Sequence, residues 1–461
     1  MAREGRLYSW IRRRPLLWEV VTLLVLIVVV FPLYLANLRE HPFHGDENGW
    51  MVDSKYFTLF FLDRDFRDPL WDDYLAYNQP PVAKYVVGAA LYFSGFEEEL
   101  RSIGEMPLWD FFRSEEWNEM RGAMPPAEML VAARTAMALM GAATCLLLYG
   151  AGRLVFGRLT GILSCLLLAV NPLMRLCCRR AMSDAPYLFF LTGCLLALIC
   201  HRRALERARS LQAVWWSAMA GIGAGLAFGT KLTGAVMLGV LGLDTCTVLI
   251  KRGSLLWRGG HRGKSFGRHL VRDKTIRIAV LGCFLAVFVS LTVFVALNPF
   301  LYKSPFKRMP WMFAHRLRAS QLQQEHFGVG LTSPVERVVH IWRRVFMPGE
   351  WVVLGNWFRL PVEPFLFAGG IGLALRNVAR SVKRRETPSP ETTVLIWTAA
   401  SFGASCMTLP LDWERYYLPL VLPVVLFVSC ALSRFPLWIG RLVKKRYAHR
   451  VSDIARTHSA N

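Results

Sequence analysis

The sequence has few charged residues, and acids are the scarcer kind. Asp, Glu, Lys and Arg make up 19% of its 461 residues, whereas soluble domains usually carry about 25%. Only 33 acids face 55 Lys and Arg, which leaves a formal net charge of +22. In a soluble chain this excess would suggest a nucleic-acid binder, but 54% of the residues are hydrophobic. The composition argues against nucleic acid as a partner and against disorder, and it indicates a polytopic membrane protein.

The sequence also lacks the cysteine patterns of disulfide scaffolds and zinc modules. Most of its 10 cysteines lie inside apolar runs, where they would pack as small apolar side chains. Only Cys177 and Cys178 lie outside these runs, and adjacent cysteines rarely bond to each other without strain. No internal repeat or low-complexity tract is present, so a repeat-based transporter is not indicated.

Long apolar runs are abundant. A helix that crosses a hydrocarbon core of about 30 Å needs roughly 20 apolar residues. The run Val82–Phe96 is short and flanked by charge, so we interpret it as interfacial or re-entrant. We predict an all-α membrane protein with about ten or eleven spans and a helical first outer loop. The ten predicted spans are Val20–Asn37, Thr135–Gly152, Leu159–Met174, Ala185–Cys200, Ser210–Thr230, Leu232–Ile250, Ile278–Asn298, Pro361–Leu375, Thr392–Leu411 and Tyr416–Ser433.

The distribution of basic residues predicts the orientation. Lys and Arg strongly outnumber acids in the loops on the side of the N-terminus, and acids roughly balance them on the other side. By the positive-inside rule, both termini are then cytoplasmic. The first run is too long for a cleaved signal peptide, and no small-residue cleavage site follows it. We expect one membrane domain, residues 1–433, with two outer loops at 38–128 and 299–360, and a basic cytoplasmic tail at 434–461.

Two adjacent acids open the first outer loop, in the motif His44-Gly45-Asp46-Glu47. Such a pair at the membrane surface suits a general base and a residue that positions the nucleophile or a metal ion, although a solvated turn has the same pattern. About thirty residues later, Pro80-Pro81 precedes Lys84. We expect this lysine at the depth of the phosphate headgroups, unless it simply reaches to the surface as lysines near membranes do.

Cations and a third acid occupy the turns on the same side. The segment Arg179-Arg180-Ala181-Met182-Ser183-Asp184 contradicts the charge bias of that side, which favours an anionic ligand. Asp184 also fits an N-cap of the helix that follows, and the sequence does not separate capping from catalysis. Lys231 stands alone between two spans. Two or more cations that meet at one leaflet suit a lipid phosphate.

Five motifs in order resemble the GT-C glycosyltransferases of the protein O-mannosyltransferase and aminoarabinose transferase type (glycosyltransferase family 39 and its bacterial relatives). They are His44-Gly45-Asp46-Glu47, Pro80-Pro81-x-x-Lys84, Arg180-Ala181-Met182-x-Asp184-x-Pro186, Lys231 and Arg415-Tyr416-Tyr417-x-Pro419. Each motif is short, but together they extend over nearly the whole chain. The sequence departs from the family at Gln79, where a histidine is often found.

The resemblance implies a role for each matching residue. Asp46 matches the catalytic acid and the base for the acceptor, Glu47 is its motif partner, and Asp184 matches a second acid of the same site. The residues expected near the donor phosphate are Lys84, Arg180, Lys231 and Arg415. Further candidates for substrate contact in the outer loops are Tyr77, Gln79, Tyr85, His315 and Tyr416. If a divalent metal ion takes part, Asp46, Glu47 and Asp184 are its expected ligands.

The resemblance implies transfer of a sugar from a polyprenyl-phosphate-linked donor to an acceptor hydroxyl on the non-cytoplasmic face. The acceptor can be a protein, a glycolipid or a polysaccharide. Direct displacement at the anomeric carbon would invert it, and a phosphate leaving group requires no general acid. The alternative is a transporter or flippase of polyprenyl-linked sugars, since cations at the outer face also suit lipid phosphate. Transporters, however, usually place charges near the membrane midplane, where Arg134 and Asp244 are the few candidates.

Two weaker signals remain. The outer loop Pro299–Leu360 fits either a lid over the donor or a basic patch that contacts anionic lipid. His41 and His44 have helical spacing, but Pro42 lies between them, so a metal site there is not favoured.

Overall fold

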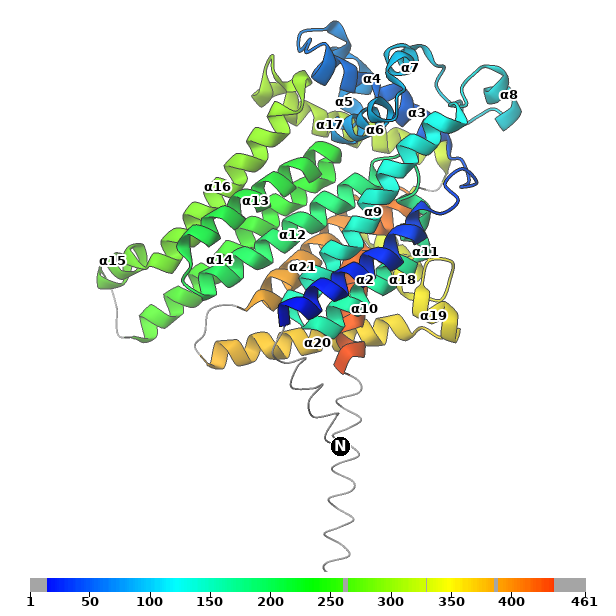
Figure 1. Cartoon of the computed structure of the whole chain (residues 1–461). Helices are drawn as coiled ribbons and strands as arrows, with labels where there is room; N and C mark the ends of the chain where they lie inside the picture. Colours follow the sequence, from blue (N-terminus) through cyan, green and yellow to red (C-terminus); the bar gives the residue numbers. More distant parts are fainter. Residues whose placement is uncertain (1–14, 260–263, 329, 385–388, 435–461) are drawn as a thin grey trace, which may run out of the picture.

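The computed structural model describes residues 15–259, 264–328, 330–384 and 389–434 (Figure 1). They fold into helices joined by turns and short loops, and the one β interaction in these ranges is an isolated bridge between Gly330 and Leu411. The predicted all-α fold is therefore confirmed. The predicted basic tail lies outside the described residues, except for Arg434.

Seven segments of the described chain form helices long and apolar enough to cross a membrane, and each coincides with a predicted span. They make the protein a multi-pass integral membrane protein. The seven are Leu16–Leu35 in α2 (Pro15–Leu35), Ala127–Val155 (α9), Asp184–Glu206 (α12), Ser210–Thr230 (α13), Leu232–Arg258, which contains α14 (Val236–Arg258), Lys274–Ala296 (α16), and Glu414–Arg434, here called the last span.

The other three predicted spans are not both long and apolar enough to count as membrane-crossing helices. The described residues therefore do not confirm a count of ten spans. The run expected at 159–174 is divided into α10 (Arg158–Val170) and α11 (Pro172–Cys177). Asn171 between them accepts the backbone N–H of Met174 at 3.0 Å and so starts a new helix. Both α20 (Val362–Lys383) and α21 (Pro390–Thr408) are long enough, but charged residues interrupt the former and Thr and Ser dilute the latter.

The bundle is built around α12, which packs against α9 and α13, and α13 packs in turn along α16 (Figure 1). Small residues allow the last contact. A Cβ added to Gly221 or to Gly225 would lie 2.6 Å from the carbonyl oxygen of Ala286 or Ser290, respectively. Small residues four positions apart let two membrane helices approach to backbone contact. The sequence therefore fixes how tightly α13 and α16 pack.

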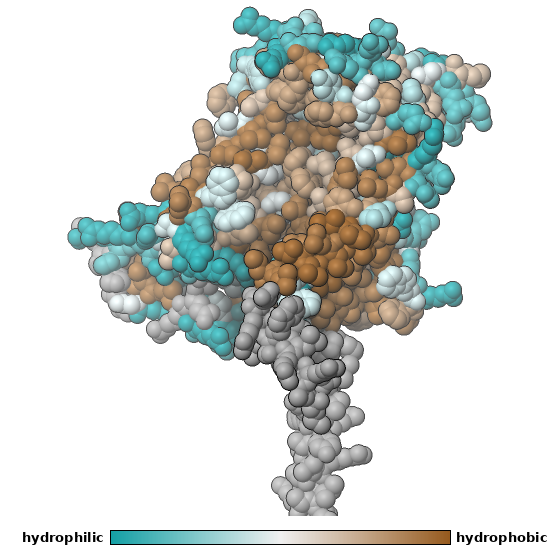
Figure 2. Space-filling view, in the orientation of Figure 1, coloured by the Kyte–Doolittle hydropathy of each residue, from teal (hydrophilic) through white to brown (hydrophobic). Residues whose placement is uncertain are grey.

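The outer surface of the bundle is apolar where the long helices are exposed. Figure 2 shows a broad hydrophobic area in the region of α2, and polar residues toward both ends of the long helices. On α2 only 11% of the apolar window is buried, and Leu16 and Val28 are largely exposed. Such a surface matches a hydrocarbon environment.

The segment between α2 and α9 folds into six short helices at one end of the long ones, here called the loop-rich end (Figure 1). The expected helical character of this loop is confirmed. The basic helix α15 (Lys264–Arg272) lies at the opposite end. The six helices are α3 (Gly45–Asp53), α4 (Lys55–Phe57), α5 (Tyr74–Asn78), α6 (Val82–Phe93), α7 (Glu97–Ser102) and α8 (Glu115–Met120).

The second long loop, between α16 and α20, is also helical. It contains α17 (Pro305–Phe327), α18 (Pro334–Phe346) and α19 (Val353–Phe358). The bridge between Gly330 and Leu411 and a hydrogen bond of 2.8 Å from Gln324 to the carbonyl of Pro410 attach the α17–α18 turn to the chain just before the last span. This attachment brings the loop beside Arg415.

Candidate active site

Asp46 owes its position to the start of α3. His44 is the N-cap: its Nδ1 accepts the backbone N–H of Asp46 at 3.2 Å. Glu47 completes a capping box, because its Oε2 accepts the backbone N–H of His44 at 3.1 Å. Asp46 lies in the first turn, where the helix dipole stabilises a negative charge. The motif therefore presents Asp46 as a partly exposed carboxylate at a rigid helix end.

Glu47 does not share this exposure, and this corrects the expectation that it acts beside Asp46. Its carboxylate is fully buried and makes a two-point ion pair with Arg134 of α9, with N–O distances of 2.8 and 2.7 Å. Arg134 also donates to the carbonyls of Leu38 and His41 at 2.9 and 2.8 Å. Arg134, taken from the sequence as a midplane candidate, is thus the buried anchor of the Asp46 loop.

The same carboxylate joins two sequence motifs. Oε1 of Glu47 accepts the backbone N–H of Ala181 at 2.8 Å. Ala181 directly follows Arg180 and lies three residues before Asp184, so one buried group sets the position of both motif loops. A carboxylate with this many donors is held in place by geometry and by charge-assisted hydrogen bonds.

Asp46 pairs with Arg415, which lies 369 positions further along the chain. The two side chains are 25% and 21% exposed, so the pair is neither buried nor freely solvated. The guanidinium of Arg415 lies 5.1 Å from the ring centre of Trp413 and 5.6 Å from that of Tyr416. Contact with two aromatic rings stabilises the cation and limits its rotamers.

Asp184 forms a second acid–cation pair, with Lys231 at 2.5 Å. Ser183 is the N-cap of α12, and Asp184 is the first helical residue, so the capping interpretation of Asp184 is wrong. Asp184 is 2% exposed, and its Oδ2 has no hydrogen-bond partner among the described residues. Lys231 reaches it from the C-cap of α13 and remains partly exposed. One oxygen of the acid is therefore left for a further partner.

The two pairs belong to one cluster. Arg415 lies in the electrostatic field of both Asp46 and Asp184. Burial lowers the pKa of His44, and the positive charges of Arg180 and Arg415 act in the same direction, against the charge of Asp46. His44 is therefore neutral at pH 7.

Arg180 is the cation of this cluster without an acid. Its side chain is half-buried, and in the described part of the chain it has neither an ion pair nor a hydrogen-bond acceptor. Lys231 and Arg415 are each paired with an acid. Arg180 has no such partner, so its positive charge is available to bind an anion. The cluster consists of His44, Asp46, Arg180, Asp184, Lys231 and Arg415.

The structure shows Lys84 as a buried and paired side chain, and not as a cation that is free to bind a phosphate. Its side chain is completely buried. The amine lies 3.2 Å from the carboxylate of Asp53, contacts the carbonyl of Leu75 and lies 4.9 Å from the ring centre of Tyr56. Here Lys84 joins α3, α5 and α6, because a buried ammonium needs a charged partner and several acceptors. It does not face the cluster as a free cation.

The remaining loop candidates do not lie together in one part of the structure. Tyr77 and His315 pack edge to face at 5.0 Å, with Trp311 stacked on His315, and so join the two long loops. Tyr85 is buried and donates to the carbonyl of Leu297 at 2.9 Å, which makes it a packing residue. Only Tyr416 lies at the cluster, beside Arg415. Gln79 is the C-cap residue of α5 and is half-buried.

The acids do not form a metal centre by themselves. Among the described residues no three His, Cys, Asp or Glu side chains come close enough to hold one ion. Glu47 is saturated by Arg134, and Asp46 and Asp184 each face a cation. Burial lowers the pKa of His41 to about 4, and its Nε2 lies 3.0 Å from the carbonyl of Leu176. His41 is therefore a buried structural histidine.

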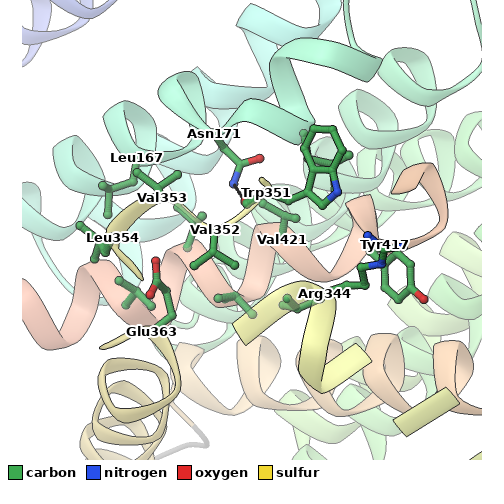
Figure 3. Close-up of a pocket in the computed structure, with 15 residues that line it drawn as sticks. Leu167, Asn171, Arg344, Trp351, Val352, Val353, Leu354, Glu363, Tyr417 and Val421 are labelled. Carbon is green, nitrogen blue, oxygen red and sulfur yellow. Dashed lines mark hydrogen bonds between the residues drawn. The ribbon is translucent and has the colours of Figure 1, made fainter. Parts of the chain in front are cut away.

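The structure also has an apolar pocket (Figure 3). It lies between α10, α11, the α18–α19 segment and valines of the last span. Glu363 lies near one end, and Arg344 and Tyr417 lie near the other (Figure 3). Both Arg344 and Tyr417 bond to Asp412, at 2.8 and 2.7 Å, respectively. Tyr417 follows Tyr416 in the chain, so the polar end of the pocket adjoins the cluster.

Three partners of the motif residues were not predicted. Arg134 was noted as an unusual charge in an apolar run, and that signal could have identified it as the partner of a loop acid. Asp53, which pairs with Lys84, has no distinguishing pattern in the sequence. Asp412 lies three residues before Arg415, yet only the fold shows that it binds α18 through Arg344.

A sequence model described as dolichyl-phosphate-mannose-protein mannosyltransferase matches residues 73–307, about half of the chain. No curated protein matches the sequence.

Solved structures match over almost the whole chain. The archaeal oligosaccharyltransferase AglB from Archaeoglobus fulgidus, in complex with an inhibitory peptide and a dolichol-phosphate, has 16% identity and a TM-score of 0.52, over 95% of this chain and 52% of AglB. ArnT from Cupriavidus metallidurans bound to undecaprenyl phosphate has 16% identity and a TM-score of 0.51, over 94% of this chain and 63% of ArnT. The chain thus spans half to under two thirds of these proteins. The likeness confirms the GT-C fold expected from the sequence.

Proposed function

Because the chain belongs to the dolichyl-phosphate-mannose-protein mannosyltransferase family, we propose that it is an integral membrane glycosyltransferase. It takes a sugar from a polyprenyl-phosphate-linked donor and transfers it to an acceptor hydroxyl. The observation that carries this proposal is the cluster at the loop-rich end. Four separate segments of the chain bring two acids and three cations together there. Transfer from a lipid phosphate needs both a base and cations.

Asp46 is the proposed base. It lies at the exposed edge of the cluster, whereas Glu47 and Asp184 are buried. In the reaction the acceptor oxygen forms a bond to the anomeric carbon as the bond from that carbon to the phosphate oxygen breaks. The acceptor proton goes to Asp46, and the electron pair of the broken bond leaves with the lipid phosphate. Attack opposite the phosphate inverts the anomeric centre.

Arg180, Lys231 and Arg415 are the proposed phosphate ligands. Arg180 is unpaired, so it can bind the phosphate without losing a partner among the described residues. Arg415 is paired with Asp46, and the two cannot both serve the reaction while they remain paired. We infer that the donor phosphate draws Arg415 away from Asp46, which then accepts the proton. Lys231 pairs with Asp184 and remains partly exposed, so it can also bind the phosphate.

Sidedness follows from the charge bias of the sequence. The cluster lies at the end of the long helices opposite the basic helix α15 (Figure 1). By the positive-inside rule α15 is cytoplasmic, so the site opens to the non-cytoplasmic face, and both termini are cytoplasmic. The acceptor is a protein, a glycolipid or a polysaccharide. The family description makes a protein hydroxyl the first to test.

The test uses the purified full-length chain in lipid nanodiscs with labelled polyprenyl-phosphate sugars, mannose first, and acceptors of the three classes. We expect a glycosylated product from the unmodified chain. Asp46→Asn should lower the rate by about 10²- to 10⁴-fold with normal folding. Asp72→Asn is the matched control, since Asp72 is an acid of the same loop whose partners, Lys303 and Arg308, are outside the cluster. Full activity of Asp46→Asn would refute the assignment. Movement of lipid-linked sugar across vesicles without any product would favour a flippase.

A further inference from the structure

Three arginines lie close together in the sequence before α12 but do not share one environment: Arg175, Arg179 and Arg180. Arg180 belongs to the cluster, because its positive charge acts on His44. Arg179, the next residue, reaches in another direction and donates to the carbonyl of Ala36, just past the end of α2. Arg175, in the last turn of α11, lies in the field of Arg179 and of Tyr34 on α2. Arg175 and Arg179 therefore form a pair that the proposed reaction does not use.

This pair has no counter-charge. In the described part of the chain neither side chain has a carboxylate within ion-pair distance. Arg179 is 8% exposed, and its Nε is buried without a hydrogen-bond acceptor. Arg175 is half-buried, and its Nε is also buried without a hydrogen-bond acceptor. None of the described residues accepts a hydrogen bond from its side chain. Two arginines four positions apart in the chain thus each have a buried Nε–H without an acceptor.

Burial and the neighbouring positive charges make the charged forms of the two arginines energetically unfavourable. Burial lowers the pKa of Arg179, and the charges of Arg175 and Arg134 lower it further. The charge of Arg134 is matched by Glu47, but no acid matches the other two. Buried like charges usually persist where a ligand or partner of opposite sign compensates them.

Helix capping explains only part of the arrangement. An arginine near the end of a helix can donate to its last carbonyls, as Arg179 does at the end of α2. One carbonyl, however, satisfies one of the five N–H groups of a guanidinium and brings no negative charge. It leaves Arg175 without any acceptor.

We propose that Arg175 and Arg179 form a second anion site, separate from the donor site, which binds the phosphate of an anionic phospholipid at the membrane surface beside α2. The two forks of N–H donors match the oxygens of a phosphate. A lipid source is favoured because α2, which borders the pair, has an exposed apolar face (Figure 2). An acyl chain can lie along this face while the headgroup reaches the two arginines.

The test compares thermal midpoints of the full chain in nanodiscs of phosphatidylcholine alone and with added phosphatidylglycerol. We expect phosphatidylglycerol to raise the midpoint of the unmodified chain, as a ligand that binds only the folded state does. Arg175→Gln should lose most of this rise and should bind phosphatidylglycerol about fivefold more weakly, since one basic side chain near the surface contributes about that factor. Arg39→Gln is the matched control, because Arg39 is an exposed arginine near the same helix end, paired with Glu128.

A second arm adds inorganic phosphate in detergent without phospholipid. If phosphatidylglycerol but not phosphate raises the thermal midpoint, and Arg175→Gln abolishes this increase, the ligand is a lipid headgroup. An equal rise with phosphate, also lost in Arg175→Gln, supports the site but overturns the lipid source. If Arg175→Gln responds like the unmodified chain, or Arg39→Gln loses as much as Arg175→Gln, the site itself is refuted. Arg179→Lys keeps the charge and should respond more strongly than Arg179→Gln.

Discussion

Glu47 and Arg134 form a fully buried ion pair with two N–O contacts, of 2.8 and 2.7 Å. Arg134 lies in α9, so this pair attaches two motif loops to a membrane-spanning helix. Oε1 of Glu47 also accepts the N–H of Ala181, beside Arg180, and Oε2 accepts the N–H of His44, beside Asp46. The acid adjacent to the proposed base is thus part of the framework. A variant at Glu47 should therefore behave unlike a variant at Asp46.

We expect Glu47→Gln to destabilise the folded chain and to abolish activity together. Removing one partner of a buried pair leaves an uncompensated charge and costs about 3–5 kcal/mol. Thermal unfolding in nanodiscs should show a clearly lower midpoint for Glu47→Gln and a nearly unchanged one for Asp46→Asn. Combining Glu47→Gln with Arg134→Met removes the orphaned charge and should restore part of the midpoint. Equal midpoints for Glu47→Gln and the unmodified chain would contradict a framework role.

The pairing of Asp46 with Arg415 predicts competition between the base and the donor phosphate. Asp46→Asn leaves Arg415 without its acid, so the arginine is free for an anion. We expect Asp46→Asn to bind a polyprenyl phosphate about tenfold more tightly than the unmodified chain, although it cannot transfer sugar. That factor corresponds to about 1.4 kcal/mol, the scale of one charge-assisted hydrogen bond.

The controls for this competition are a variant of Arg415, its combination with Asp46→Asn, and a variant outside the cluster. Arg415→Gln should bind the lipid phosphate more weakly, and adding Asp46→Asn to it should bring no gain. The unmodified chain and Asp72→Asn should bind equally, because Asp72 is outside the cluster. Weaker binding by Asp46→Asn would mean that Asp46 itself holds the donor. No binding by the unmodified chain would instead count against the proposed function.

Sequence reasoning located the cluster but not its internal pairing. The motif order and the outer position of the turns predicted that Asp46, Arg180, Asp184, Lys231 and Arg415 meet, and the structure brings these five together. Which acid faces which cation depends on packing between segments up to 369 residues apart. No local pattern of charge or hydropathy carries that information.

The errors have physical causes of the same kind. Lys84 was expected near the donor phosphate because it follows Pro80-Pro81, as in the family motif, but its side chain is buried. Its partner, Asp53, lies on α3, and the sequence offers no sign that the two helices pack. The span at 159–174 was predicted from hydropathy alone, although Asn171 and Pro172 are together a strong start signal for a new helix.

Lys231 is expected to be needed for its charge, more than for its shape. Asp184 is 2% exposed, and Lys231 at 2.5 Å is its one ion-pair partner in the described chain. Lys231→Gln should lower transfer by at least tenfold and raise the KM for the donor, whereas Lys231→Arg should keep most of the activity. Steady-state kinetics with varied donor concentration would measure both. If Lys231→Gln changes kcat alone and leaves the KM for the donor unaltered, Lys231 supports Asp184 and does not contact the phosphate.

Stability near the site should fall as the pH falls, because of His41. Burial lowers its pKa to about 4, below the usual 6.5, so the folded chain holds His41 neutral while the unfolded chain protonates it. A lowered pKa contributes stability that is complete above pH 6.5 and is lost as the pH falls toward 4. We expect the thermal midpoint of the unmodified chain to drop more steeply between pH 7 and pH 4.5 than that of His41→Asn. The amide of Asn can still donate to Leu176 but does not titrate. Parallel slopes for the two proteins would show that His41 has the same pKa in the folded and the unfolded chain, which contradicts the lowering by burial.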